Sequence, residues 1–445
     1  MSCSPNDSNN IETITTSEIE AEAENTDSNS DNTSGFTIIP QTITSPNILL
    51  IIADDMGMDA TPYATQFSSQ KPNMPTLDKL VAAGVRFTNA WAYPKCTPTR
   101  ASIITGKQAP QTDVYNPGDY IDLTETSIQD YIKTNASANY TTAVFGKWHI
   151  TNGSNPIEKK LNIDTYKGSL DGGVSDYYNW DLDEDGNNTP QTNYYTTTAY
   201  TDYAIDWINK QSTPWFCWLA YNAAHTPFHT PNDDSLFSTE TSANSDLTMY
   251  LQMLEAMDTE IARLLNSMSS TELNNTTIIF IGDNGTPTQV AQSPFSKTSS
   301  KGSLHNGGVN VPLVVAGANT LRANTEDTSL VQSADLFATI ADLAGVTNPN
   351  ANESISFKEL LTNTTTHSRE FNYAQIPAGN ATYGGYTVRN SSYKLNYDTD
   401  NNTYYLYDVI NDYEESKNLY DGSLNSEEQI AFDTLKTEAE RILAL

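Results

Sequence analysis

Runs of apolar residues that stop abruptly at polar ones recur through the first two thirds of the chain. The clearest is PNILLIIADD (46–55), in which isoleucines and leucines run directly into two aspartates. Four further runs have the same character: TTAVFGKW (141–148), WFCWLAY (215–221), TTIIFIGDNG (276–285) and VPLVVAG (311–317). Short continuous apolar runs of this kind predict strands that are buried on both faces.

Helical periodicity appears between these runs, in TLDKLVAAGV (76–85, ended by Gly84), YTDYAIDWINK (200–210) and LTMYLQMLEAMDTEIARLLNSM (247–268). Strands that alternate with helices predict an α/β fold, with a large, mostly parallel mixed sheet sandwiched by helices. In such sheets the ligand site forms beyond the carboxyl ends of the strands.

The pattern changes after about residue 365, where aromatic and polar residues alternate between turn signals. With the amphipathic stretch 426–445, this predicts a smaller C-terminal antiparallel sheet plus a helix. The N-terminal stretch is acidic and poor in large apolar residues, so we expect it to be disordered. The predicted organisation is a disordered acidic tail over 1–36, an α/β domain over 37–365 and an α+β subdomain over 366–445.

The chain is strongly acidic: its 445 residues include 55 Asp and Glu against 23 Lys and Arg, a net charge of −32. Nucleic acid binding requires a basic surface, so this balance argues against it. The charge fits a protein of salty water, and it equally fits one that is simply kept soluble by its charge. No apolar run is long enough to predict a transmembrane segment.

The three cysteines form no disulfide framework. Cys217 lies in an apolar run and is expected in the core. Cys3 begins the acidic tail, an arrangement that resembles a mature bacterial lipoprotein; the alternative is a tail residue without a role. The first interpretation predicts a periplasmic, cell-surface or secreted protein that is lipid-anchored through Cys3.

Side chains with oxygen ligands follow two of the predicted strands. Asp54 and Asp55 end one strand, and Asp283 and Asn284 end another. Buried carboxylates are costly unless they are paired or bind a metal ion. Three carboxylates and an amide oxygen suit Ca²⁺ or Mg²⁺, and the size and irregularity of the set favour Ca²⁺. The alternative is that each pair only caps a helix or forms a turn.

The scarce basic residues gather in or beside the loops at these strand ends. The set comprises Arg100, Lys147, His149, His225, His229, Lys301 and His305. Their gathering predicts a positively charged pocket for an anion. The alternative for any one of them is a solvated surface lysine or a structural histidine.

KCTPTRASIITGK (95–107) places a cysteine at the start of a predicted helix. Pro98 suits the first helical turn, and Gly106 ends the helix. Cys96 would therefore lie at a helix N-terminus, where the dipole favours anions and lowers the pKa of a thiol. Taken alone, this indicates the nucleophile of a cysteine phosphatase or a redox thiol.

CTPTRASIITG resembles the signature of the type I sulfatases of the alkaline phosphatase superfamily, Cys-x-Pro-x-Arg followed by Ala-Ser and a closing Thr-Gly. The resemblance continues in the family's order from about residue 45 to about residue 420. It is carried by IIADDMG, GKWHI, AAHTPFHTP, IGDNG, KGSLHNGGVNVPLVV and the C-terminal YKLNY and YYLYDVINDYEESKNL. The chain is similar to bacterial carbohydrate sulfatases.

The resemblance implies that Cys96 is converted to formylglycine by a sulfatase-maturing enzyme, which reads Pro98 and Arg100 as part of its signal. The hydrated aldehyde is a geminal diol, one of whose hydroxyls attacks the sulfur of a sulfate ester and displaces the alcohol, which leaves the sulfate bound to residue 96. The second hydroxyl then loses its proton, sulfate is expelled and the aldehyde is restored.

The resemblance also implies roles for individual residues. The ligands of Ca²⁺, or alternatively of Mg²⁺, would be the modified Cys96, Asp54, Asp55, Asp283 and Asn284. Arg100 would stabilise the diol, and Lys147 and Lys301 would hold the sulfate oxygens. His149 would serve the step that restores the aldehyde, and His225, alone or together with Lys301, would help to protonate the leaving oxygen.

One stretch departs from the family pattern. After the lysine the family has an aromatic residue, Glu-Gly-Gly and then an Arg before Val-Pro, whereas residues 305–312 read HNGGVNVP. Asn306 and Asn310 replace the Glu and the Arg, so we expect a supporting ion pair to be lost. His229 and His305 have no fixed role in the family; they could touch the sugar, and equally they could be structural.

WDLDEDGNNT (180–189) has Asp at 181, 183 and 185 before Gly186, as in the first half of a calcium loop. The distal Glu is missing, so a polar hairpin turn is the favoured interpretation.

The chain is therefore predicted to be a sulfuric ester hydrolase acting on a sulfated carbohydrate, a marine-type polysaccharide or its oligosaccharides. One alternative is a phosphonate or phosphate ester hydrolase of the same superfamily, although five histidines leave little for a second metal site. Another is a non-catalytic surface protein that binds glycans on this scaffold, although Cys96, Arg100, Lys147 and His149 are all present.

Overall fold

The computed structural model describes residues 35–67, 70–151, 161–239, 245–365, 367–377, 383–420 and 423–445. Ser34–Leu445 form the larger compact unit, which holds all of the described residues. Residues 1–34 of the predicted tail, including the predicted lipid anchor at Cys3, lie outside the described residues. No helix in the described ranges is both long enough and apolar enough to span a bilayer.

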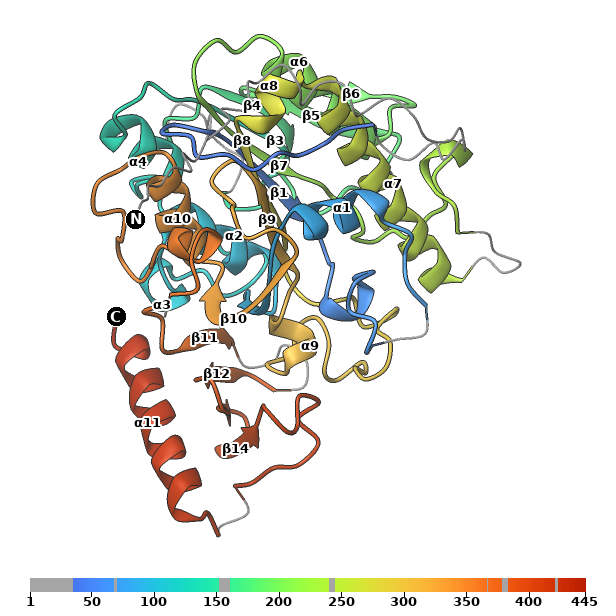
Figure 1. Ribbon diagram of the computed structural model, residues 1–445. Coiled ribbons are helices and arrows are strands. Elements are labelled where there is room, and N and C mark those ends of the chain that lie inside the picture. Colours follow the sequence, from blue (N-terminus) through green and yellow to red (C-terminus); the bar gives the residue numbers. More distant parts are fainter. Residues whose placement is uncertain are drawn as a thin grey trace, which may run out of the picture. The chain divides into compact units, whose positions relative to one another are not determined.

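A ten-stranded sheet runs through the larger unit, in the order β10-β2-β9-β8-β1-β7-β3-β4-β5-β6 (Figure 1). Its strands are β1 (Asn47–Ala53), β2 (Gly84–Trp91), β3 (Thr141–Lys147), β4 (Thr165–Ser169), β5 (Trp180–Glu184), β6 (Asn187–Gln191), β7 (Trp215–Ala220), β8 (Thr276–Gly282), β9 (Leu313–Gly317) and β10 (Thr325–Gln332). The central strands β8, β1, β7, β3 and β4 are parallel to one another. The predicted α/β fold with a mostly parallel mixed sheet is confirmed.

Two neighbouring strands show what the sequence pattern could not reveal. β9 pairs antiparallel with both β8 and β2, because a continuous apolar run reports burial on both faces and not strand direction. β2 was not predicted. Its sequence, GVRFTNAW, interrupts the apolar run with three side chains that are only half-buried.

Alternate side chains of β1 enter two different apolar cores. Leu49 and Ile51 pack on one face with helices α1, α6 and α7, and Ile48 and Leu50 pack on the other face with α2, α4 and α10. These helices are α1 (Pro75–Ala83), α2 (Cys96–Thr105), α4 (Ile128–Asn135), α6 (Thr196–Ile208), α7 (Asp246–Ser267) and α10 (Asp335–Leu343). Because successive side chains of a strand point to opposite faces of the sheet, β1 packs against helices on both faces. Phe36, which the sequence placed in the tail, is buried in the first core.

Shorter elements connect the main ones. They are α3 (Ala109–Thr112), α8 (Ser270–Asn274), α9 (Asn306–Val309), and the single turns η1 (Met58–Ala60), η2 (Asp234–Leu236) and η3 (Lys358–Leu361). The predicted end of α2 is confirmed at Gly106, which has a φ of 67°. A Cβ there would lie 2.9 Å from the ring of Phe337, so both the backbone conformation and the packing require glycine.

The predicted C-terminal antiparallel sheet and helix are confirmed. The elements are β11 (Asn372–Ile376), β12 (Gly385–Arg389), β13 (Tyr393–Asp398), β14 (Thr403–Asp408) and α11 (Ser426–Leu443), with the strands paired in chain order. Val388, Leu395 and Leu406 pack against Leu435 and Ile442 of α11. Their burial holds the helix on one face of the small sheet.

Residues 180–189 form the favoured hairpin, β5–β6. Oδ1 of Asp183 accepts a hydrogen bond from the amide of Gly186 at 3.0 Å, which closes the turn. The hairpin lies at the edge of the large sheet, next to β4.

Candidate active site

The carboxyl ends of β1 and β8 bring the predicted acidic residues together. The two strands are parallel neighbours, and the amide of Asp283 donates to the carbonyl of Ala53 at 3.1 Å. Asp54, Asp55, Asp283 and Asn284 therefore leave the sheet side by side, and all four are buried. This is the edge at which open α/β sheets bind their ligands.

Cys96 is the first residue of α2, as predicted, and its side chain is buried. Ligand atoms of Cys96, Asp54 and Asp283 all lie within 4.8 Å of one another. The sulfur is 3.3 Å from Nδ1 of His149, and Oγ1 of Thr97 is 3.2 Å from the same nitrogen. The structure thus joins the cysteine, the acidic residues and a histidine in one group.

Arg100 and Asp283 form a buried ion pair one helical turn after Cys96. Nε and Nη2 of Arg100 donate to the same carboxylate oxygen at 3.0 and 2.8 Å, and both side chains are 0% exposed. Nη1 donates to the carbonyl of Lys147 at 2.9 Å, which ties α2 to the end of β3. Charge-assisted bonds of this kind fix the guanidinium in one orientation.

Two lysines pair with the remaining carboxylates. The ammonium group of Lys147 contacts Asp54, and that of Lys301 contacts Asp55. Burial raises the pKa of the Cys96 thiol, but the positive charges of Lys147, Lys301 and Arg100 together outweigh burial and lower it. The position of Cys96 therefore favours negative charge, as the anion pocket inferred from the sequence requires.

Two buried oxygens in this group have no hydrogen-bond partner among the described residues: Oδ1 of Asp54 and Oδ1 of Asn284. The amide nitrogen of Asn284 donates to Asp55 at 2.8 Å and to the carbonyl of Gly285 at 3.0 Å, which leaves its oxygen for another ligand. Burial and the charge of Asp283 raise the pKa of Asp54 well above its usual value. Orphaned buried oxygens are costly, and a divalent cation is a partner that carboxylate and amide oxygens of this kind accept. The residues therefore fit a metal ion.

His149 follows β3 and His225 follows β7, so both reach the same edge of the sheet. Burial and the charge of Lys147 lower the pKa of His149 to about 3. Burial also lowers the pKa of His225, whose Nδ1 lies 2.9 Å from the carbonyl oxygen of Thr226. Both rings are favoured in the neutral form, in which one nitrogen can accept a proton.

The family model described as Sulfatase matches residues 46–346. The chain belongs to the sulfatase family. A second model, described as N-sulphoglucosamine sulphohydrolase, C-terminal, matches residues 299–442. The predicted type I sulfatase of the alkaline phosphatase superfamily is confirmed, and the protein is a sulfuric ester hydrolase.

Relatives are named as sulfatases, and a solved structure shares the fold. Uncharacterized sulfatase YdeN of Escherichia coli (strain K12) is 24% identical over 469 residues, covering 84% of this chain and 82% of that protein. The Ulvan-active sulfatase of Formosa agariphila is 26% identical, covering 72% of this chain and 66% of that protein. The crystal structure of Ps i-CgsB in complex with k-i-k-neocarrahexaose has the same fold, with a TM-score of 0.77 and 24% identity over 90% of this chain and 93% of that chain.

The sulfatase places two adjacent glycines against the histidine rings. A Cβ on Gly172 would lie 2.5 Å from Nε2 of His149, and one on Gly173 would lie 3.0 Å from Nδ1 of His225. The loop can pass this close to both rings only because neither residue has a side chain. The sequence analysis missed this loop, whose only signal was the pair of glycines in DGGVS (171–175).

Gly172→Ala should lower kcat/KM for sulfate release about a hundredfold, because the added methyl group must displace the ring of His149. The free energy of unfolding should fall by only about 1–3 kcal/mol. Steady-state kinetics and urea unfolding measure the two effects. Gly35→Ala is the matched control, since a Cβ there meets its nearest neighbour at an ordinary 3.7 Å. Unchanged kinetics in Gly172→Ala would show that the loop does not hold the histidine.

The two histidines without a family role have other neighbours in the sulfatase. The ring of His229 lies 4.4 Å from that of Tyr177, and Nδ1 of His305 lies 2.7 Å from Glu415. In the described ranges, no hydrogen bond or ion pair joins either histidine to Cys96. Their contact with a substrate stays a prediction.

A buried ion pair from the C-terminal part supports the stretch that departs from the family pattern. Lys394 pairs with Glu415, and their side chains are 0% and 1% exposed. Glu415 accepts from the amide of Asn306 at 2.9 Å, and Lys394 donates to the side-chain oxygen of Asn306 at 3.2 Å. The family's Glu and Arg are absent, as the sequence shows, but a different pair of charges stands beside Asn306. The sequence analysis missed it because its members lie 88 and 109 residues from Asn306 along the chain.

Glu415→Gln should lower the free energy of unfolding by about 3–5 kcal/mol near neutral pH, because it leaves the ammonium of Lys394 buried without a counter-charge. Burial raises the pKa of Glu415, but the charges of Lys394 and His305 outweigh burial and hold it well below its usual value. A carboxyl group of this kind stabilises the fold above its unfolded pKa, near 4.5, and the contribution is lost as the pH falls towards the folded pKa.

Urea unfolding at a series of pH values measures this effect. The loss of stability below pH 4.5 should be steeper in the wild type than in Glu415→Gln. Glu414→Gln, at the exposed neighbouring position, should behave like the wild type. If stability fell equally steeply below pH 4.5 in the wild type and in Glu415→Gln, the lowered pKa of Glu415 would be contradicted.

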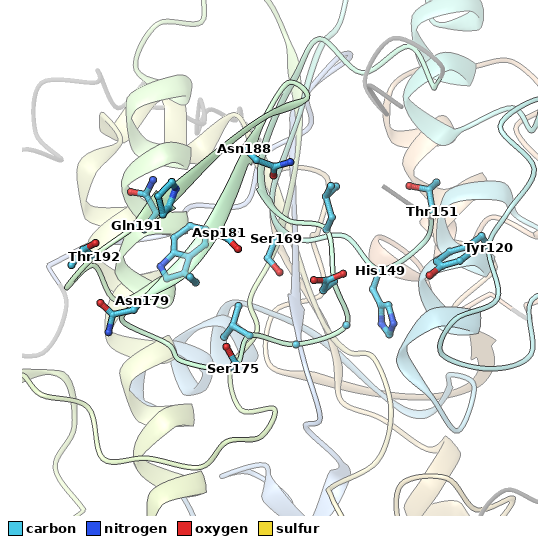
Figure 2. A pocket seen from close by; sticks show the side chains of 17 residues that line it. Tyr120, His149, Thr151, Ser169, Ser175, Asn179, Asp181, Asn188, Gln191 and Thr192 are labelled. Atoms are coloured by element: carbon cyan, nitrogen blue, oxygen red, sulfur yellow. The ribbon is translucent and has the colours of Figure 1, made fainter. Parts of the chain in front are cut away.

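Two cavities border the Cys96 group. The larger, of about 820 Å³, is lined by His149 and by residues of the loop after β4 and the β5–β6 hairpin (Figure 2). The smaller, of about 260 Å³, is lined by Asp55, Lys95, His225 and Lys301 among others.

Proposed function

We propose that this sulfatase hydrolyses sulfate esters of a sulfated carbohydrate through a formylglycine formed at Cys96. The observation that carries the proposal is the place of Cys96, at the start of a buried helix and beside three cations and a neutral histidine. A site of this kind favours an anion at residue 96 and stabilises further negative charge as it develops there.

The carbohydrate is proposed from the relatives. One of them is named for activity on ulvan, and the solved structure with the same fold holds k-i-k-neocarrahexaose. An open cavity of about 820 Å³ beside His149 supports a sugar substrate, because it exceeds what a sulfate group alone would occupy. We extend the proposal to a marine-type polysaccharide or its oligosaccharides.

The metal ion would be Ca²⁺, held by Asp54, Asp55, Asp283, Asn284 and an oxygen of the modified residue 96. When bound, such an ion lowers the pKa of a coordinated hydroxyl and offsets the charge of the sulfate group. The all-oxygen donor set and the two orphaned oxygens support a hard cation.

The other side chains of the site would each have a separate role in catalysis. Lys147 and Lys301 would hold the sulfate oxygens, and Arg100 would stabilise the hydrated form of residue 96. His149 would take the proton of the second hydroxyl, for which its neutral ring and its position beside Cys96 suit it. His225, after it has taken up a proton, would give that proton to the leaving oxygen, together with Lys301. A sulfatase-maturing enzyme and a periplasmic, cell-surface or secreted location complete the proposal.

The function is tested with a matched pair of substrates, an aryl sulfate and the corresponding aryl phosphate. Protein co-produced with a formylglycine-generating enzyme should release the phenol from the sulfate much faster than from the phosphate. A panel of defined sulfated oligosaccharides, with free sulfate measured, then identifies the sugar. Preference for the phosphate would replace the sulfatase proposal by a phosphate ester hydrolase, and inactivity on every ester would favour a glycan-binding protein.

Calcium should raise the thermal midpoint of chelator-treated protein by a few degrees, because an ion that binds only the folded state stabilises it by mass action. Asn284→Ala should weaken this response, since it removes one of the two orphaned oxygens without changing the charge of the site. Differential scanning calorimetry with calcium and with magnesium makes the measurement. A midpoint that responds to neither ion would contradict the metal site.

A further inference from the structure

The two walls of the larger cavity come from different segments of the chain. One wall is formed by Asp181 and Asn188 of the β5–β6 hairpin and by Asn179, which directly precedes the hairpin. The opposite wall is formed by His149 and Tyr120 (Figure 2). Ser169, which precedes the DGGVS loop, and Ser175, the last residue of that loop, lie between the two walls. Since His149 is 3.3 Å from Cys96, the cavity begins where the sulfate would be bound.

The described lining of this cavity has a charge opposite to what a second anionic group requires. Among its described lining residues there is no Lys or Arg, and there are two carboxylates, Asp171 and Asp181. Neither carboxylate makes a hydrogen bond or ion pair through its side chain with another described residue. The smaller cavity, in contrast, is lined by Lys95 and Lys301.

The other lining side chains suit an uncharged sugar. Asn188, Gln191, Thr192 and Ser175 offer amide and hydroxyl groups, which exchange hydrogen bonds with sugar hydroxyls. Tyr120 is 45% exposed at the cavity, where its ring can lie against the apolar face of a pyranose. Carboxylates accept hydrogen bonds from hydroxyl groups and repel a sulfate or carboxylate placed against them.

We propose that this cavity selects a neutral, unsulfated sugar unit next to the unit that carries the cleaved sulfate. Asp171 and Asp181 are its specificity-determining residues, and they exclude a second sulfate or a uronate from that position. The inference rests on the proposed function, because it assumes that the sulfate of a carbohydrate is bound at Cys96.

The inference places the enzyme in a reaction sequence. Where a polysaccharide carries sulfate on adjoining units, another sulfatase must first remove the sulfate that would enter this cavity. Where the adjoining unit is neutral by nature, the enzyme can act without that step. In both cases its product retains the neutral unit unchanged.

The experiment uses two oligosaccharides that share one cleavable sulfate, chosen from the panel as a substrate the enzyme desulfates. They differ only in a second sulfate on the adjoining unit. The calcium-loaded, formylglycine-containing enzyme should show a kcat/KM at least about tenfold lower for the disulfated compound. The double variant Asp171→Asn/Asp181→Asn should reduce this ratio about tenfold, mainly by lowering KM for the disulfated compound.

Asp206→Asn is the matched control, because it removes an exposed carboxylate on α6 that does not line the cavity. Its ratio should equal that of the wild type. Equal rates on the two compounds, or a ratio that the double variant leaves unchanged, would overturn the inference while the sulfatase proposal stands. Failure to hydrolyse any sulfate ester, the aryl sulfate included, would overturn both.

Discussion

Cys96→Ala should lower the rate of sulfate release by on the order of 10⁵-fold, because residue 96 supplies the nucleophile in the proposed reaction. The fold should survive, since the loss of one buried sulfur atom costs only about 1 kcal/mol. Initial rates on an aryl sulfate, with thermal unfolding measured in parallel, separate the two effects. A folded variant that retained more than about a tenth of the wild-type rate would contradict this role.

Cys96→Ser tests the chemistry at the same position more closely. A serine hydroxyl can attack sulfur, but it cannot form the geminal diol that later expels sulfate. The variant should therefore gain one sulfate group per chain and stop, and intact-protein mass spectrometry should detect the addition. Cys217→Ser, at a buried cysteine of β7, is the control and should gain no sulfate. Turnover by Cys96→Ser at the wild-type rate would show that no second hydroxyl is needed.

Arg100→Met should have the second large effect, on stability as well as on activity. Arg100 makes two hydrogen bonds to Asp283, and both side chains are completely buried. Removing the cation leaves the carboxylate without its partner, which should lower the free energy of unfolding by about 3–5 kcal/mol. The measurement is made with chelator present, so that no bound cation compensates for the lost guanidinium.

The double variant Arg100→Met/Asp283→Asn separates charge from shape. Because it removes both charges and keeps an oxygen acceptor for the amide of Asp55, it should recover most of the lost stability. It should nevertheless stay inactive, since the site has lost both a cation and a predicted metal ligand. Equal stabilities of the single and double variants would show that the ion pair is not the cause.

The sequence predicted the strands at the centre of the sheet because they are buried on both faces, which leaves continuous apolar runs. The polar residues that end these runs, such as Asp54 and Asp283, could be placed at one edge because parallel strands share the direction of their carboxyl ends. The position of Cys96 followed from Pro98 and Gly106, which mark the two ends of α2. These parts of the site depend on local patterns.

The remaining features depend on contacts between distant segments. The approach of Gly172 to His149 and the pairing of Glu415 with Lys394 bring together residues from separate strands and loops. β9 runs antiparallel to its neighbours although its composition matches theirs. Asp171 and Asp181 line the same cavity only because the β5–β6 hairpin lies beside the loop after β4. No local period or motif encodes such neighbours.

The most direct test of the central claim is the mass of the peptide that contains Cys96, taken from protein that is actively releasing sulfate. The account predicts that the thiol of residue 96 has been replaced by an aldehyde, and that the fraction converted tracks the specific activity of each preparation. Fully active protein in which Cys96 retains an unmodified thiol would contradict it.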